Sequence, residues 1–103
     1  MKILQRTAQY FRGKRAEYGF QQRCKDTGLT PWPVARGANS PYKFGVTLNW
    51  SPNNKSYVVD KEAKLVLFAA NAVAEQFGLE RLVTQPTLAA GGALVMYVGF
   101  KQN

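Results

Sequence analysis

A strict alternation of apolar and other residues runs through the middle of the chain. Its apolar members, at every second position, are Tyr42, Phe44, Val46, Leu48 and Trp50. A period of two predicts a β-strand over residues 42–50 with one buried face. Residues 51–54 (SPNN) have the composition of a turn, and residues 57–59 (YVV) resume a β-prone run. We therefore predict a hairpin here.

A helical spacing of apolar residues follows, over residues 61–77. Its stripe consists of Leu65, Val66, Ala69, Ala72, Val73 and Phe77. Spacings of three and four predict an amphipathic helix. Asp60 is the candidate N-cap, and Glu62 complements the helix dipole in the first turn. Gly78 is predicted to end the helix, with Leu79 closing back on the last turn.

The C-terminal region returns to β-type patterns. Leu82 and Val83 predict a short strand, and residues 93–100 predict a longer one. One face of the longer strand carries Leu94, Met96, Val98 and Phe100. Its other face is apolar too, at Val95 and Tyr97, so the strand is either central and covered on both faces or has one face at an interface. So small a body has little with which to cover both faces, which favours the second alternative. We therefore predict that Val95 and Tyr97 contact a neighbouring chain.

Residues 2–12 have the pattern of a short amphipathic helix. Its apolar face consists of Ile3, Leu4, Thr7, Ala8 and Phe11. Gly13 is predicted to end it. Because an isolated helix of this length is marginal in water, its apolar face must dock on the body of the chain, on a partner or on lipid. Ile3, Leu4 and Phe11 are therefore candidate interface residues.

Residues 13–41 combine glycines, prolines and basic residues without a sustained period, which predicts an extended arm. Tyr18, Phe20 and Trp32 are unusual in such a segment, since each large ring needs a surface to cover. The predicted organisation is a basic amphipathic helix with an extended arm (residues 1–41) and a small body (residues 42–103). The fold class is α+β, with a small antiparallel sheet (strand, strand, helix, strand) packed on one helix.

Charge is distributed unevenly between these two parts. The first 43 residues hold nine of the 14 basic residues against only Glu17 and Asp26, while the remainder holds five basic and four acidic residues. A basic, aromatic-containing segment attached to a nearly neutral body is typical of proteins that contact polyanions or the interior of a large assembly.

The composition argues against an enzyme. The chain has no histidine and a single cysteine, so neither a Ser/His/Asp or Cys/His arrangement nor a Cys/His metal site can be assembled, and we expect no metal or cofactor. The carboxylates form no evident acid/base pair. No secretory signal is present, which predicts a protein that is cytoplasmic or within a particle rather than secreted.

Cys24 lies between Arg23 and Lys25. Two neighbouring cations are expected to lower the pKa of a thiol, so a reactive cysteine is conceivable. An incidental cysteine in a basic arm is the simpler interpretation, and we favour it.

Polyanion binding is the best positive signal. Candidate phosphate contacts are Arg6, Arg12, Lys14, Arg15, Arg23 and Lys25, and candidate stacking platforms are Tyr10, Tyr18 and Phe20. No sequence-reading motif accompanies them, so the hypothesis is non-enzymatic binding of nucleic acid without sequence preference, within a larger assembly.

The alternative hypothesis is a purely structural subunit of a virion or other large particle. In that case the arm and the last strand would pack against neighbouring protein chains or further copies of this one. Membrane association is a third, less favoured class, because the apolar face of residues 2–12 is short and contains no tryptophan.

Overall fold

The computed structural model describes the backbone of residues 2–34, 40–49 and 56–102, and the side chains of residues 11–34, 40–49, 59–89 and 91–102. The elements, in chain order, are α1 (Lys2–Asp26), β1 (Thr30–Pro33), β2 (Phe44–Leu48), α2 (Ser56–Phe77), β3 (Glu80–Val83), β4 (Thr87–Leu88), a short 3-10 turn (Ala90–Gly92) and β5 (Leu94–Lys101).

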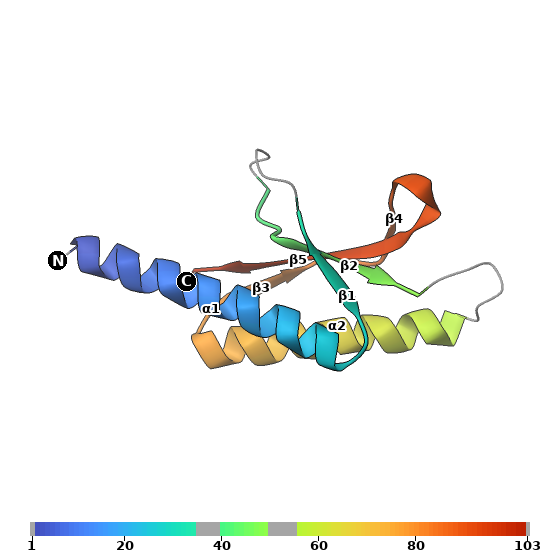
Figure 1. Cartoon of the computed structure of the whole chain (residues 1–103), viewed down its shortest axis with the longest axis horizontal. Coiled ribbons are helices and arrows are strands. Elements are labelled where there is room, and N and C mark those ends of the chain that lie inside the picture. Colours follow the sequence, from blue (N-terminus) through green and yellow to red (C-terminus); the bar gives the residue numbers. More distant parts are fainter. Residues whose placement is uncertain (1, 35–39, 50–55, 103) are drawn as a thin grey trace.

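The strands form one antiparallel sheet in the order β1-β2-β5-β3, and β4 pairs with β5 beside the end of β3. The two helices run side by side in opposite directions across one face of this sheet (Figure 1). The predicted α+β class with a small antiparallel sheet packed on a helix is confirmed. Neither of the helices described here is long and apolar enough to cross a membrane.

The first helix is much longer than predicted. It continues through Gly13 to Asp26, so the extended conformation predicted from residue 13 onward is wrong for this stretch. Ala16, Phe20 and Cys24, spaced four apart, are all fully buried in the core. An interior glycine costs a helix about 1 kcal/mol, whereas burying one large apolar side chain contributes about 1.5–3 kcal/mol. The helix contains two interior glycines, Gly13 and Gly19, and the burial of the inward stripe outweighs them.

β1 also lies in the segment predicted as an arm. It is an edge strand paired with β2, and it contains Pro31 and Pro33. The N–H of Val34 points towards β2 and donates to the carbonyl of Lys43 at 3.0 Å. Backbone N–H groups alternate in direction along a strand, so the nitrogens of residues 31 and 33 point the other way. Both proline nitrogens therefore face the outer edge, where a missing N–H costs nothing.

Trp32 lies between these prolines and covers the second face of β2. It pairs with Gly45, and a Cβ built on Gly45 would overlap the indole ring. The indole Nε1 donates to the Thr47 hydroxyl at 2.9 Å. Tyr97 and Tyr42 extend the same aromatic cluster, with ring centroids 6.1 Å (Trp32–Tyr97) and 6.2 Å (Tyr42–Tyr97) apart. Tyr42 therefore does not share the inward face of Phe44, as the alternation predicted, because β2 begins only at residue 44.

The predicted hairpin after β2 is wrong, because α2 begins at Ser56 and includes residues 57–59. Val59 packs against the core and starts the same helical stripe as Ala63 and Val66. The β-propensity of the valines is overridden by this helical spacing. Asp60 consequently lies inside the helix rather than at its N-cap.

Glu62 is buried in α2, not exposed in a first turn. Its Oε1 accepts the backbone N–H of Asn49 at 3.0 Å, and its Oε2 accepts the Asn49 side-chain amide at 3.1 Å. The carboxylate thereby fixes the residue that follows β2 onto α2. Buried acids need such partners, and both oxygens have one here.

Both helices end in the same way. Gly78, at φ +64°, follows α2, and Leu79 N–H donates to the Ala74 carbonyl at 2.8 Å. This hydrogen bond and the left-handed glycine form a Schellman motif, which confirms the predicted stop. At the end of α1, Gly28 (φ +81°) and the bond from Leu29 to the Cys24 carbonyl repeat it.

The inward face of β5 is as predicted, with Met96 and Val98 buried against the helices and Phe100 packed beside them. The outward face differs from the prediction. Val95 is only 2% exposed within the single chain, and Tyr97 is half-buried beside the Trp32 ring. Val95 therefore needs no neighbouring chain to cover it.

Candidate nucleic-acid interface

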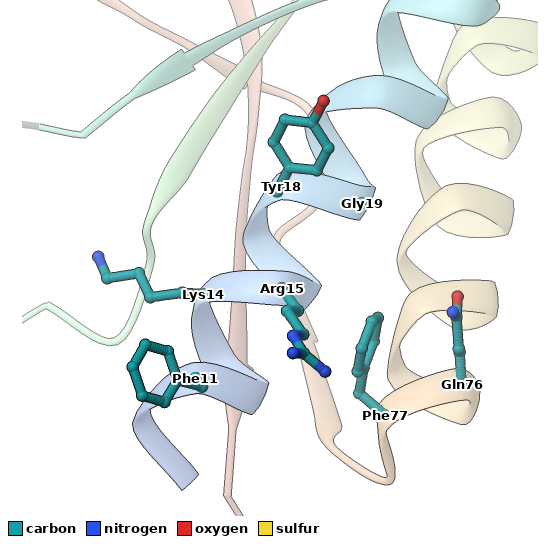
Figure 2. A pocket seen from close by; sticks show the side chains of 7 residues that line it. All are labelled: Phe11, Lys14, Arg15, Tyr18, Gly19, Gln76 and Phe77. Atoms are coloured by element: carbon teal, nitrogen blue, oxygen red, sulfur yellow. The ribbon is translucent and has the colours of Figure 1, made fainter. Parts of the chain in front are cut away.

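A groove lies between the outer face of α1 and the C-terminal end of α2 (Figure 2). Its volume is about 420 Å³, and it is lined by Phe11, Lys14, Arg15, Tyr18, Gly19, Gln76 and Phe77. A second hollow of about 560 Å³ adjoins it, shares Phe11, Arg15, Gln76 and Phe77, and adds Arg12. Together these hollows form what we call the α1–α2 groove.

The sequence of α1 places these side chains by helical spacing. Phe11, Arg15 and Tyr18 lie at i, i+4 and i+7 and so share one face. Ala16 and Phe20, on the opposite face, are fully buried. The outer face is correspondingly open, since Phe11 is 54% and Tyr18 65% exposed.

Gly19 lies where α1 meets α2 beside the groove. A Cβ built there would lie 3.9 Å from the Phe77 ring and from a methyl group of Val73. The absence of a side chain on Gly19 therefore leaves the Phe77 ring uncovered on the groove side. Figure 2 shows the Arg15 side chain and the Phe77 ring facing each other across this space.

The electrostatic character of the groove is positive. Arg12, Lys14 and Arg15 are exposed, and no carboxylate is among the described residues that line the groove. Lys14 Nζ lies 3.8 Å from Glu17 Oε2, in an i,i+3 pair with half of the lysine side chain exposed. An exposed pair of this kind is worth less than about 1 kcal/mol, so an incoming anion can compete for the lysine.

Three of the predicted phosphate-binding residues and one predicted platform meet at this groove. They are Arg12, Lys14, Arg15 and Tyr18. Phe11, predicted as an interface residue, joins them. The side chains of Arg6, Tyr10, Ile3 and Leu4 lie outside the described residues.

Phe20 is not a stacking platform, and that prediction is wrong. It is fully buried, with its ring centroid 5.7 Å from that of Phe44 and 5.8 Å from that of Phe100. An aromatic ring with an i+4 core neighbour on each side belongs to the inward stripe of the helix.

Arg23 and Lys25 are exposed but lie on the last turn of α1, away from the groove. Cations there are favoured by the helix dipole. Between them, Cys24 is fully buried, and this burial raises its pKa to about 12. The expectation that its basic neighbours would lower the pKa is wrong, because desolvation of the thiolate dominates.

Gly19, Gln76 and Phe77 are the groove residues that sequence reasoning missed. Phe77 was assigned to the buried stripe of its helix, and it is in fact half-buried with one side facing the groove. Only the antiparallel pairing of α1 with α2 brings it beside Arg15. No motif within either helix announces that pairing.

Comparisons of the chain with protein-family models, with curated proteins and with solved structures give no match.

Proposed function

We propose that the α1–α2 groove binds single-stranded nucleic acid without sequence preference, and that the chain acts as a binding protein rather than an enzyme. The observation that carries the proposal is the grouping of two exposed rings, Phe11 and Tyr18, with three exposed cations on one helix surface. Unpaired bases stack on exposed aromatic rings, and the backbone follows positive charge. The net charge of +8 adds long-range attraction.

Three features support this chemistry over a generic basic surface. The three cations lie between the two rings along about two turns of α1, so a strand that stacks on both rings passes the cations with its phosphates. The rings lie opposite the core face, and each is more than half exposed. Phe77 adds an apolar floor beside Arg15.

The charge test uses two matched triple variants. In Arg12→Ala/Lys14→Ala/Arg15→Ala, the slope of log affinity against log salt should fall by about two units, since each lost phosphate contact removes about 0.7. The control, Lys43→Ala/Arg81→Ala/Lys101→Ala, removes equal charge from exposed residues in or beside strands β2, β3 and β5, none of which lines the groove. Fluorescence anisotropy of a labelled homopolymeric oligonucleotide measures both. Equal slopes for the two variants would show that the groove is not the site.

The stacking test changes one ring. Tyr18→Ala should weaken binding by about 1–3 kcal/mol with the salt slope unchanged, whereas Tyr18→Phe should retain most of the affinity. Loss of affinity in both variants would point to the hydroxyl group rather than to stacking, and would contradict the proposed platform.

The structural-subunit hypothesis makes the opposite prediction. A purely structural chain would show only weak, sequence-blind attraction to an oligonucleotide. Absence of measurable binding at about 50 mM salt, where electrostatic attraction is strong, would overturn the nucleic-acid proposal and leave the structural subunit standing. Residence in a larger assembly stays a prediction. Sedimentation of the protein after nuclease treatment tests it, because a chain that remains monomeric at high concentration without nucleic acid would count against protein neighbours.

A further inference from the structure

The two halves of the molecule have the same layout, offset by 50 residues. One half is α1-β1-β2 and the other is α2-β3-β5, with β4 inserted. The corresponding strands are Thr30–Pro33 with Glu80–Val83, and the central strands begin at Phe44 and Leu94. In the sheet order β1-β2-β5-β3, the two central strands are equivalent to each other and so are the two outer strands, so a two-fold rotation about the centre of the sheet would exchange the halves.

Helix ends and buried positions follow the same offset. Gly28 and Gly78 have positive φ and are each followed by a buried leucine that donates to the helix. The buried positions correspond as Ala16 with Val66, Phe20 with Ala70, Cys24 with Ala74 and Leu29 with Leu79. The two halves therefore correspond in which individual side chains are buried as well as in the order of their elements.

The strand register locates an approximate two-fold axis. Val46 of β2 pairs directly with Met96 of β5, which is its own equivalent under the offset. In an antiparallel pair, a residue that faces its own equivalent lies on the axis that exchanges the strands. The outer strands depart from this symmetry, because Thr30 pairs with Thr47 whereas Glu80 pairs with Lys101.

The same operation relates the exposed face of α1 to that of α2. Tyr18 corresponds to Phe68, and the two side chains are 65% and 67% exposed. One turn before each ring is an exposed lysine, Lys14 in α1 and Lys64 in α2. The symmetry thus repeats a lysine–aromatic pair on the outer surface of the helical layer.

The last turn of α1 supplies further charge near Phe68. Gly19 lies against Val73 and Phe77, which sets the level of the antiparallel helices. Counting along α2 from there, Phe68 lies level with the turn that carries Arg23 and Lys25, about 12 Å along the helix direction from Tyr18 at 1.5 Å per residue. Asp26 is in this turn too, so the second position is less positive than the groove.

We infer that Lys64 and Phe68 form a second, weaker half-site for the same nucleic-acid strand, with Arg23 and Lys25 contacting the intervening phosphates. This inference rests on the proposed function of the groove. One strand would then cross both helices, stacking first at Tyr18 and then at Phe68. Occupancy of the second half-site needs a strand long enough to span them, within the range of about 4–16 nucleotides that single small domains cover.

The test compares a short and a long homopolymeric oligonucleotide, of about 4 and about 12 nucleotides. The unmodified chain should bind the long strand more tightly than the short one. Phe68→Ala should reduce this ratio of affinities about five- to 100-fold, as expected for one lost stacked base. Its affinity for the short strand should stay unchanged. Leu88→Ala is the matched control, since Leu88 is 65% exposed on β4, off the helical layer.

Each outcome separates the two ideas. Absence of binding by the unmodified chain would overturn the proposed function and this inference together. Binding that depends on Tyr18 but has the same length dependence in Phe68→Ala would overturn the inference alone. A Phe68→Ala variant with altered sedimentation in the absence of nucleic acid would assign the ring to contacts between chains instead. Circular dichroism melts verify that the variants are folded. Lys64→Gln, which leaves the Phe68 ring intact, should also reduce the preference for the long strand.

Discussion

Both faces of α1 carry aromatic rings, but in opposite environments. The inward face buries Ala16, Phe20 and Cys24 completely, while Phe11 and Tyr18 on the outward face are more than half exposed. Aromatic type alone therefore does not indicate a role. Position on the helix decides whether a ring stabilises the fold or is available to a ligand, and the two functions can be separated by single substitutions.

The largest expected effect concerns Cys24, on the inward face. Burial raises its pKa from 9.0 to about 12, and each pKa unit changes the thiolate fraction tenfold. At pH 8–9, a thiol-specific reagent should therefore modify the folded chain on the order of a thousandfold more slowly than the denatured chain. Rapid labelling of the folded chain would show that the inward face opens.

The same shift has a consequence for stability. The folded state holds the thiol proton of Cys24 more tightly than the unfolded state does. The stability that the protonated thiol contributes is therefore fully present below pH 9 and is lost as pH rises towards 12. A Cys24→Ala variant lacks this term. The difference in unfolding free energy between the two proteins should accordingly shrink above pH 9, as urea denaturation at several pH values can measure.

Phe20 and Tyr18 give the most direct comparison of the faces. Phe20→Ala should cost about 3–5 kcal/mol of stability, because it empties a site between Phe44 and Phe100. Tyr18→Ala should change stability by no more than about 0.5 kcal/mol. Denaturant titration measures both, and comparable losses would mean that the outward face is packed as well.

Trp32 covers the face of the sheet opposite the helices, and its indole ring packs directly on Gly45. Gly45→Ala places a methyl group inside the indole ring position and should cost about 1–3 kcal/mol through overpacking. Gly19→Ala is the control, since its Cβ would make only ordinary contacts. Thermal melts in which the two variants behave alike would contradict the close approach of Trp32.

The sequence predicted those elements whose period is undisturbed. The inward residues of β2 and β5 and the C-terminal stop of α2 at Gly78 follow directly from spacing and from glycine chemistry. The missed elements each contain a residue that usually breaks them, glycine in α1 and proline in β1. Tertiary burial overrode these local preferences, and burial depends on partners that are distant in the sequence.

The candidate site was predictable to a similar extent. Charge and aromatic density singled out Arg12, Lys14, Arg15 and Tyr18, because these properties belong to the segment itself. The prediction for Phe20 is wrong because the residue type does not distinguish a ring that stacks on a ligand from a ring that is buried in the core. Phe77 became part of the site only through the pairing of the two helices, which no local pattern encodes.

The smallest expected effect concerns Gly13, the residue that the sequence suggested as the end of the helix. It lies inside α1, and among the described side chains a Cβ there would meet the amide of Gln102, at 3.7 Å. Because alanine restricts the unfolded chain and favours the helix, Gly13→Ala should stabilise the protein by about 0.4–1 kcal/mol. Denaturant midpoints resolve a change of this size. Destabilisation by Gly13→Ala would mean that α1 does not continue through residue 13, and that the groove lined by Phe11 and Arg15 is not built as described.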